Sequence, residues 1–291
     1  MRIAVLSTPG SWYFKDLTRA AGERFQLTPI TFRDLSVRLG QGPEKIRSQV
    51  CLSEFDAVIV RTMPPGSLEQ VVFRMDALAR HESAAGVVVN SARALETSVD
   101  KYLASAKLQA AGLLVPRTIV CQTSEEAMEA FLELDGDVVL KPLFGSEGRG
   151  IARLTDEALA LRAFKMLESM GAVLYLQAFI SHDGYDLRVM VIGDRVLGMT
   201  RRNALDWRTN VSRGASVEVL QVTDALGELA KRAAQSVGAE IAGVDFLPSR
   251  EGAMYAIEVN AVPGWKALAT ATGEDVAQMV LGHVEQLCWS R

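Results

Sequence analysis

Three short, β-branched runs in the first 95 residues constrain the fold of this chain more than any other feature. They read RIAVLS (2–7), FDAVIVRT (55–62) and AAGVVVNS (84–91), and segments with helical spacing lie between them. Short apolar runs are typical of strands buried on both faces. Their alternation with helices is typical of a parallel sheet covered by helices. We therefore expect an α/β domain over residues 1–95.

Length and composition are those of a folded globular protein. The chain has 291 residues, 49% hydrophobic and 23% charged, with a formal net charge of −4. This acidic balance disfavours a basic nucleic-acid-binding surface. Cys51, Cys121 and Cys288 lie far apart, as is typical of proteins in a reducing compartment. Without an apolar run of about 18 residues, we expect a cytoplasmic protein that does not enter a membrane.

Beyond residue 95 we expect helices alternating with antiparallel strands. Ser98 or Asp100 can cap a helix, because short polar side chains accept hydrogen bonds from the first free backbone N–H groups. Two alternating segments, each interrupted by glycine, predict β-hairpins. The expected hairpins cover 187–202, with the turn at Gly193-Asp194, and 241–260.

The stretch VVLKPLFGSEGRGIARL (138–154) indicates an anion-binding loop between two strands. Lys141 ends an apolar run and precedes Gly145, Gly148 and Gly150. In a Walker A loop the lysine instead follows the glycines and opens a helix. Backbone N–H groups of a glycine turn can point at phosphate oxygens, and the lysine adds a positive charge. A plain hairpin with a solvent-exposed lysine remains an equal alternative for this segment alone.

A second stretch, GVDFLPSREGAMYAIEVNAVPG (243–264), carries a set of oxygen ligands. Glu258 and Asn260 are two residues apart on a strand, so they share a face, and Asp245 on the partner strand can face them. Two carboxylates and an amide oxygen suit Mg²⁺ or Mn²⁺ and leave positions for water and phosphate. The alternative is a solvated face, which the flanking apolar residues disfavour.

A third stretch, RRNALDWRTNVSRGA (201–215), is rich in arginine. Guanidinium groups bind carboxylates and phosphates in a bidentate manner, so this stretch can hold acidic ligands. A solvated basic face is the alternative. Upstream, Asp186 and Arg188 share a strand face, where they can contact a ribose and an acidic substrate, or form a surface ion pair. The arginines of the stretch 201–215 are Arg201, Arg202, Arg208 and Arg213.

In their order along the chain, these stretches resemble the ATP-grasp superfamily, and within it the RimK-like ligases that add glutamate to an acceptor carboxylate. The resemblance begins near residue 90 with SVDKYLASAKLQAAGLLVP and continues through the glycine stretch, YLQAFI, the arginine-rich stretch and AIEVNAVPG. It implies an α/β (α+β) ATP-grasp fold. A Rossmann-like N-terminal domain (1–95) would precede two mixed lobes (96–175 and 176–291) that clasp ATP.

The resemblance also implies the site residues. For ATP it implies Lys101, Lys141, Gly145, Ser146, Gly148, Gly150, Gln177, Ala178, Phe179, Asp186, Arg208, Thr209 and Asn210. For Mg²⁺ (or Mn²⁺) it implies Asp245, Glu258 and Asn260, and as catalytic arginines Arg188, Arg202 and Arg213. Ala178 departs from the family, whose members often carry an acid there.

The implied reaction joins a carboxylate to an amine through an acylphosphate, with ADP as product. Glutamate would be the amine. The acceptor would be a small cofactor such as tetrahydromethanopterin or a protein tail, and a homo-oligomer stays open. A ligase of the same fold for another amino acid or peptide pair, and a nucleotide-binding module without catalysis, are the alternatives. Nucleic acid is a disfavoured partner.

Overall fold

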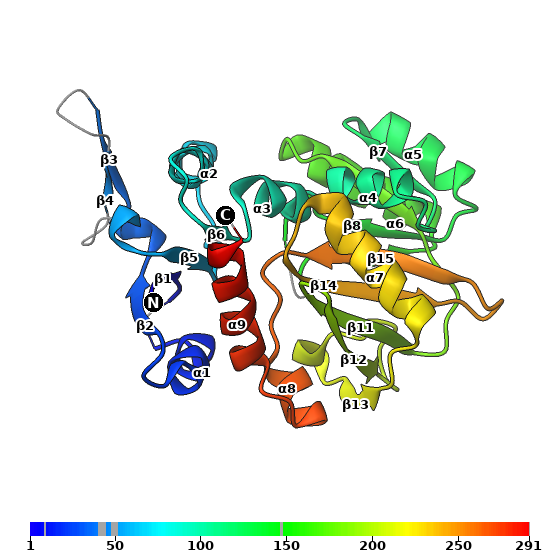
Figure 1. Ribbon diagram of the computed structural model, residues 1–291. Coiled ribbons are helices and arrows are strands. Elements are labelled where there is room, and N and C mark those ends of the chain that lie inside the picture. Colours follow the sequence, from blue (N-terminus) through cyan, green and yellow to red (C-terminus); the bar gives the residue numbers. More distant parts are fainter. Residues whose placement is uncertain (9, 40–44, 48–51, 146–147, 291) are drawn as a thin grey trace.

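The computed structural model describes residues 1–8, 10–39, 45–47, 52–145 and 148–290. They form three large β-sheets flanked by helices (Figure 1). Ser146 of the predicted ATP-binding set lies outside the described residues. Among the described residues, no helix is both long and apolar enough to span a membrane.

The N-terminal sheet is parallel, as predicted, with the strand order β2-β1-β5-β6. Alternate side chains of β1 point to opposite faces of this sheet. Ile3 and Val5 pack with helix α1 on one face, whereas Ala4 and Leu6 pack with helix α2 on the other. Strand β2 was not predicted, because its sequence QLTPI mixes polar residues with a proline. The elements are β1 (Arg2–Leu6), α1 (Trp12–Ala21), β2 (Gln26–Ile30), η1 (Phe32–Asp34), β3 (Ser36–Arg38), β4 (Lys45–Arg47), η2 (Leu52–Glu54), β5 (Ala57–Val60), α2 (Leu68–Ser83) and β6 (Val88–Val89).

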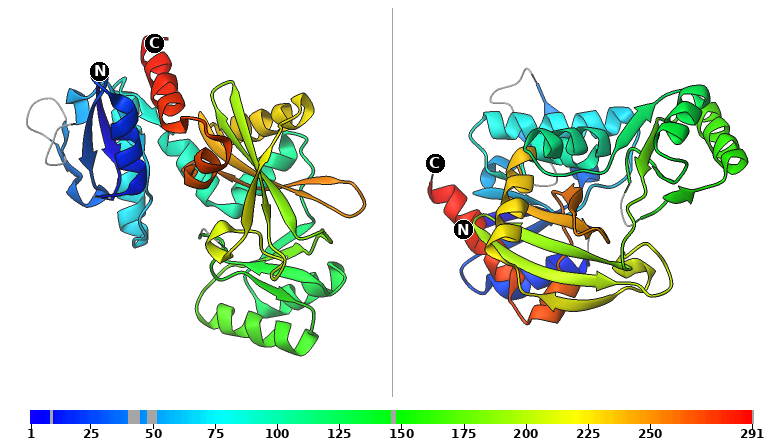
Figure 2. Two further views of the ribbon diagram at one scale, coloured as in Figure 1. Left: turned by 90° about the horizontal axis from the view of Figure 1, so that it is seen from below. Right: turned by 90° about the vertical axis from the view of Figure 1, so that its right-hand side faces the viewer.

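The middle sheet is antiparallel and has a hydrophobic core of its own, so it stands apart as a lobe (Figure 2). Phe131 of α5 and Phe164 of α6 pack onto Leu140 and Leu176 of the sheet. The side chain of Thr123 caps α5. The elements, in the strand order β7-β10-β8-β9, are β7 (Thr118–Cys121), α5 (Ser124–Glu133), β8 (Val138–Lys141), β9 (Ala152–Leu154), α6 (Glu157–Ser169) and β10 (Leu174–Ala178).

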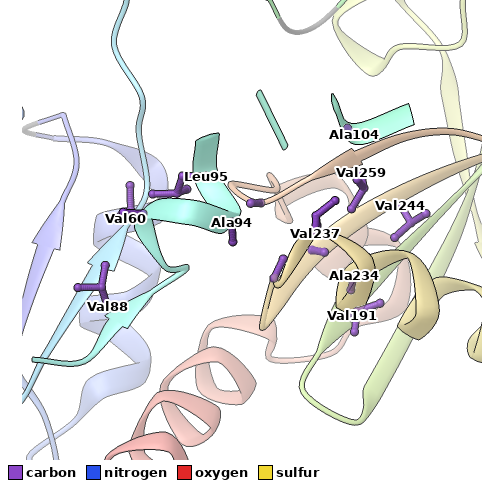
Figure 3. Packing of buried hydrophobic residues seen from close by; sticks show 14 of the residues in the cluster. Val60, Val88, Ala94, Leu95, Ala104, Val191, Ala234, Val237, Val244 and Val259 are labelled. Atoms are coloured by element: carbon purple, nitrogen blue, oxygen red, sulfur yellow. The ribbon is translucent and has the colours of Figure 1, made fainter. Parts of the chain in front are cut away.

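The C-terminal sheet contains both predicted hairpins. Its core is continuous with that of the N-terminal sheet: Val60 and Val88 belong to one cluster with Val191 and Val244, and Leu95 lies between them (Figure 3). The elements, in the strand order β13-β12-β11-β14-β15, are β11 (Tyr185–Ile192), β12 (Arg195–Arg202), η3 (Val211–Arg213), β13 (Ser216–Leu220), α7 (Asp224–Val237), β14 (Ile241–Pro248) and β15 (Met254–Asn260).

Four further helices precede or follow the strands of these sheets along the chain. Helices α3 (Ala92–Val99) and α4 (Lys101–Ala110) follow the N-terminal sheet, and the Asp100 side chain caps α4, one of the two predicted caps. Helices α8 (Lys266–Thr272) and α9 (Val276–Trp289) end the described chain. α9 packs on α1, where Arg19 binds Asp275 at 2.7 Å.

Candidate active site

A cleft that is open to solvent lies between the middle sheet, helix α4 and the C-terminal sheet. Most of the residues that the sequence singled out line this cleft, although they come from separate segments of the chain. They are Lys101, Lys141, Gly148, Gln177, Ala178, Phe179, Asp186, Arg208, Thr209, Asn210, Asp245 and Glu258.

Six other predicted residues do not line the cleft, and they differ in how they are placed. Arg188 binds Asp245, Arg213 binds the glycine stretch, and Asn260 accepts the N–H of Val262 through Oδ1 at 2.8 Å. Arg202 is exposed and covers the ring of Tyr185 at 4.8 Å. The other two are Gly145 and Gly150, which lie in the connection between β8 and β9.

Two carboxylates face each other across strands β14 and β15. Asp245 is directly opposite Glu258 in the ladder, a register shift follows between Asp245 and Phe246, and Asn260 lies on the same face of β15 as Glu258. Among the described residues, no group of three or more His, Cys, Asp or Glu side chains could hold a metal ion. The predicted metal site therefore needs the amide oxygen of Asn260 as its third protein ligand. All three donors are oxygens, which fits Mg²⁺ or Mn²⁺.

A buried network of ion pairs forms the floor of the cleft. Arg201 donates two hydrogen bonds to Asp186, at 2.7 and 2.6 Å, and also lies 3.0 Å from Asp245. Arg188 donates to the other oxygen of Asp245 at 2.7 Å. All four side chains are largely buried, so each charge depends on its partners rather than on water.

The network separates the pKa values of its two acids. Burial raises the pKa of Asp186, and Arg201 offsets only part of that effect. Burial also acts on Asp245, but the charges of Arg188 and Arg201 outweigh it and lower the pKa of that carboxyl group. Asp245 is therefore held as a carboxylate, the form that a metal ion requires.

The sequence analysis did not assign a site role to Arg201, although it noted the residue in the arginine-rich stretch. The signal was present: a hairpin that turns at Gly193-Asp194 pairs Asp186 with Arg201, and the structure has this register. Because neighbouring residues on a strand point to opposite faces, Arg201 points into the cleft and Arg202 points away from it.

Two lysines reach the cleft from the opposite side. Lys101 Nζ donates to the carbonyl oxygen of Gly145 at 2.8 Å, and Lys141 Nζ donates to Gln177 Oε1 at 2.6 Å. Burial lowers the pKa of both lysines, that of Lys141 to about 8, while the charge of Glu258 acts in the opposite direction on each. Neither amine donates a hydrogen bond to a carboxylate of the described residues, so both are available to an anion in the cleft.

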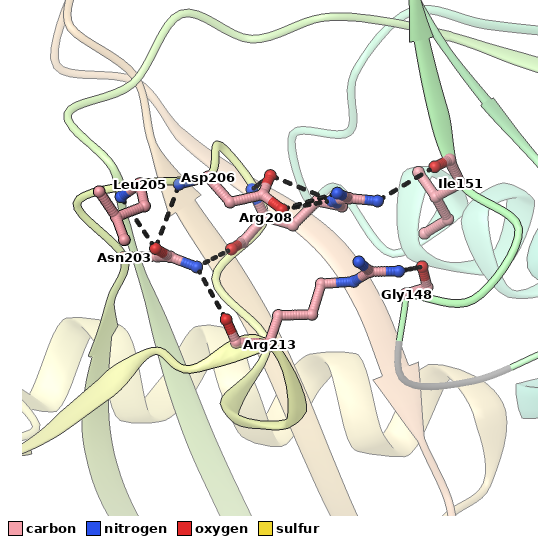
Figure 4. A network of polar contacts seen from close by, with 7 residues as sticks. All are labelled: Gly148, Ile151, Asn203, Leu205, Asp206, Arg208 and Arg213. Atoms are coloured by element: carbon pink, nitrogen blue, oxygen red, sulfur yellow. Dashed lines mark hydrogen bonds and ion pairs between the residues drawn. The ribbon is translucent and has the colours of Figure 1, made fainter.

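The connection between β8 and β9, called here the glycine loop, is held by arginines of the loop between β12 and β13 (Figure 4). Arg213 donates to the carbonyl oxygen of Gly148 at 3.0 Å, and Arg208 donates to that of Ile151 at 3.5 Å. Gly148 has a φ of +67°, and a Cβ there would lie 2.6 Å from Asn210 Oδ1. Only glycine allows this close approach.

The inner wall of the cleft is aromatic. The Arg153 guanidinium lies 3.5 Å from the centre of the Phe179 ring, and the Trp207 ring meets Phe179 edge-on at 5.8 Å. Thr209 Oγ1 donates to Asp186 at 2.5 Å, which fixes the neighbouring loop. A flat, apolar wall beside backbone groups can receive the face of a planar base.

Comparison with known proteins agrees with this arrangement. The RimK-like ATP-grasp domain matches residues 98–284. The tetrahydromethanopterin:α-L-glutamate ligase of Methanosarcina acetivorans is 32% identical over 269 residues, which is 82% of each chain. A probable α-L-glutamate ligase of Parasynechococcus marenigrum is 31% identical across all of this chain, which spans 63% of that protein. The ATP-grasp ligase PsnB, solved with a minimal precursor, Mg and ADP, superposes with a TM-score of 0.74 at 21% identity, over 99% of this chain and 98% of its own.

The chain therefore belongs to the RimK-like ATP-grasp family. It has the ATP-grasp fold, so the prediction of an N-terminal parallel sheet followed by two mixed lobes is confirmed. Its activity is that of an ADP-forming ligase that makes amide bonds, and its homologues include α-L-glutamate ligases. The prediction of an enzyme rather than a nucleotide-binding module is thereby confirmed.

Proposed function

We propose that this protein uses ATP to join L-glutamate to the carboxylate of an acceptor, through an acylphosphate. The names of its relatives support glutamate as the amine. The acceptor is a small molecule, such as the tetrahydromethanopterin that one relative's name states, or a protein tail. The proposed place of work is the cytoplasm. A ligase of the same fold for another amino acid or peptide pair is the alternative.

In this proposal the two sides of the cleft share the nucleotide. Lys101, Lys141 and the glycine loop bind the phosphates, because the lysines lie at the cleft without anionic hydrogen-bond partners. Phe179 and the backbone around Gln177 and Ala178 receive the base, and Asp186 receives the ribose. The proposed domains are 1–95, 96–175 and 176–291, with the nucleotide between the last two.

Asp245, Glu258 and Asn260 are the proposed ligands of Mg²⁺ or Mn²⁺. When bound, the ion neutralises phosphate charge during transfer of the γ-phosphoryl group. The protein's own contribution is to hold the two carboxylates opposite each other and to keep Asp245 ionised. Asp245 is held ionised by Arg188 and Arg201 before any ligand arrives, so no protein charge has to reorganise during the reaction.

Three arginines are the proposed catalytic groups. Arg213 already binds the glycine loop, so it can place positive charge beside the transferring phosphoryl group when that loop covers the nucleotide. Arg188 fixes Asp245. Arg202, whose guanidinium is exposed over Tyr185 and points away from the cleft, is proposed to bind a carboxylate of a substrate that extends out of the cleft.

One observation carries this proposal: Asp245 and Glu258 lie opposite each other in the same cleft that Lys101 and Lys141 line. The test is ADP release with Mg²⁺, glutamate and a panel of carboxylate acceptors, both small molecules and acidic peptides. We expect release that requires both glutamate and one acceptor, with an amide product of matching mass. Release with another amino acid in place of glutamate would favour the alternative ligase.

A further inference from the structure

Two unsatisfied polar side chains lie side by side in the N-terminal sheet, away from the cleft. Ser7 directly follows β1 and Arg61 directly follows β5, and these two strands are neighbours. Ser7 is 1% exposed and Arg61 is 9% exposed. Among the described residues, Ser7 Oγ and Arg61 Nε have no hydrogen-bond partner. Buried polar groups without partners are rare and require an explanation.

Their place in the sheet is one where α/β proteins bind ligands. In the order β2-β1-β5-β6 the chain leaves β1 toward one edge and returns to continue toward the other edge from β5. The carboxyl ends of β1 and β5 therefore flank a topological switch point, the place at which open α/β sheets bind ligands. Ser7 and Arg61 are the first residues beyond those two ends.

Among the described residues, Arg61 is surrounded by aromatic rings and has no carboxylate partner. Its guanidinium lies 4.2 Å from the Trp265 ring and 5.0 Å from the Tyr13 ring, and Nη2 donates to the carbonyl oxygen of Pro263 at 2.6 Å. Burial lowers the pKa of Arg61 to about 10, and no acid contributes to it. A buried cation without a counter-charge is costly, so a bound anion would remove a penalty that the free protein carries.

Asn90 shows that a buried polar side chain directly after a strand of this sheet can have all its hydrogen bonds satisfied. It follows β6 in the same sheet and is equally buried, yet both ends of its amide are bonded: Nδ2 donates to Ile241 and Ala261, and Oδ1 accepts from Glu240 and Ile241. Asn90 thus joins the sheet to the loop that follows β15. Arg61 touches the same loop but keeps a free donor.

That loop connects Arg61 to the reaction centre. It begins directly after Asn260, a proposed metal ligand, and reaches Pro263 within three residues. Gly264 follows, where a Cβ would lie 2.4 Å from Tyr13 Oη, so the loop presses against the aromatic wall around Arg61. A substrate that extends from the metal site along this loop would arrive at Arg61.

We propose that Arg61 and Ser7 form a subsite for a carboxylate of an acidic substrate, specifically one that does not react. A guanidinium Nε and a hydroxyl are donors that suit a carboxylate. The reacting carboxylate must donate an electron pair to phosphorus, and a strong bond to a buried cation would weaken it as a nucleophile. The carboxylate belongs either to the incoming glutamate or to the acceptor. This inference rests on the proposed function.

Kinetics of Arg61→Met and Ser7→Ala test the subsite. Arg61→Met keeps an apolar contact with both rings and removes the donors, and Ser7→Ala removes a hydroxyl that has no bond to lose in the free protein. We expect Arg61→Met to raise the KM of one substrate about tenfold to a hundredfold and Ser7→Ala to raise the same KM a few fold. The KM for ATP should change less than about twofold in both. The substrate affected, glutamate or acceptor, identifies the source of the carboxylate.

Arg74→Met is the matched control. Arg74 lies in the same domain, covers the Phe32 ring at 5.7 Å and donates to the carbonyl oxygen of Pro64 at 2.7 Å, but it is only partly buried. It should leave every KM unchanged. If Arg61→Met and Ser7→Ala also leave both carboxylate substrates' KM values unchanged, Arg61 is a structural residue and the subsite is overturned.

A binding measurement separates this inference from the proposed reaction. Glutarate, a dicarboxylate without an amine, is titrated calorimetrically into wild type and Arg61→Met saturated with Mg²⁺ and a non-hydrolysable ATP analogue. Affinity at least about tenfold weaker in the variant supports the subsite even if no acceptor gives ADP release. Equal binding, or no binding to either form, overturns it.

Discussion

The middle sheet and the C-terminal sheet contribute to one cleft in different ways. The middle sheet has its own core, built from α5 and α6, whereas the C-terminal sheet shares a core with the N-terminal sheet through residues such as Val60 and Val244. The functional side chains follow the same division. Asp186, Arg201 and Asp245 are tied together by buried ion pairs, whereas Lys141 makes one neutral hydrogen bond to Gln177.

This difference indicates separate roles for the two sides. The C-terminal sheet presents charges that are already arranged, so it can hold a metal ion without reorganisation. The glycine loop of the middle sheet is held from across the cleft through Arg208 and Arg213. Lys141 of β8 and Lys101 of α4 are available to bind an anion. One side is preorganised, and the other responds to the nucleotide. Four predictions test this contrast.

The largest effect is expected for Glu258→Gln on the preorganised side. The change removes one of two opposed carboxylates with little change in volume, so ADP release should fall by about a hundredfold or more while the melting temperature stays near that of wild type. Glu218→Gln, an exposed glutamate of the same sheet, is the control and should behave as wild type. Full turnover in Glu258→Gln would contradict the metal assignment.

Arg201→Met should be the most destabilising change in the cleft. It leaves Asp186 without its bidentate partner and removes one of two cations at Asp245, and breaking a buried pair costs about 3–5 kcal/mol. Urea unfolding measures the loss. Arg202→Met, on the exposed face of the same strand, should change the free energy of unfolding by less than about 1 kcal/mol. Similar values for both variants would show that the buried network doesn't stabilise the sheet.

Gly148→Ala should affect the responsive side by a smaller amount. A Cβ there would meet Asn210 Oδ1 at 2.6 Å, so the loops must separate, and the KM for ATP should rise about threefold to tenfold. Gly171→Ala is the control, because its φ of +70° carries the same backbone strain with nothing within 4 Å. Both variants should lose about 1 kcal/mol of stability. An equal KM for ATP in both variants would show that the close approach of Gly148 to Asn210 does not contribute to ATP binding.

The smallest effect is a proton taken up when ATP binds. The pKa of Lys141 is lowered to about 8 in the folded protein, below its unfolded value, so the unfolded chain holds more protons and stability rises with pH between these values. Phosphate oxygens would favour the charged amine and raise this pKa again. At about pH 9, calorimetry in buffers of different ionisation enthalpy should show uptake of up to about one proton. Lys141→Met should lose that uptake, and its absence in wild type would refute the role.

Local sequence patterns were sufficient for much of the secondary structure. The parallel strands β1, β5 and β6 and the hairpins of the C-terminal sheet were predicted, and Asp100 was one of two predicted caps. These features depend on neighbouring residues: side-chain periodicity, turn glycines and capping groups. Helices α3 and α8 were not predicted, because they are short and are stabilised by packing rather than by a repeating pattern.

The sequence by itself determined which chemical groups are present, in what order, and on which strands they lie. It could not decide that Arg201 is buried between Asp186 and Asp245, or that Arg61 is buried without a counter-charge beside Trp265. Those outcomes were decided by the tertiary structure. Burial and ion pairing depend on which segments meet in space, and the segments that meet here are far apart along the chain.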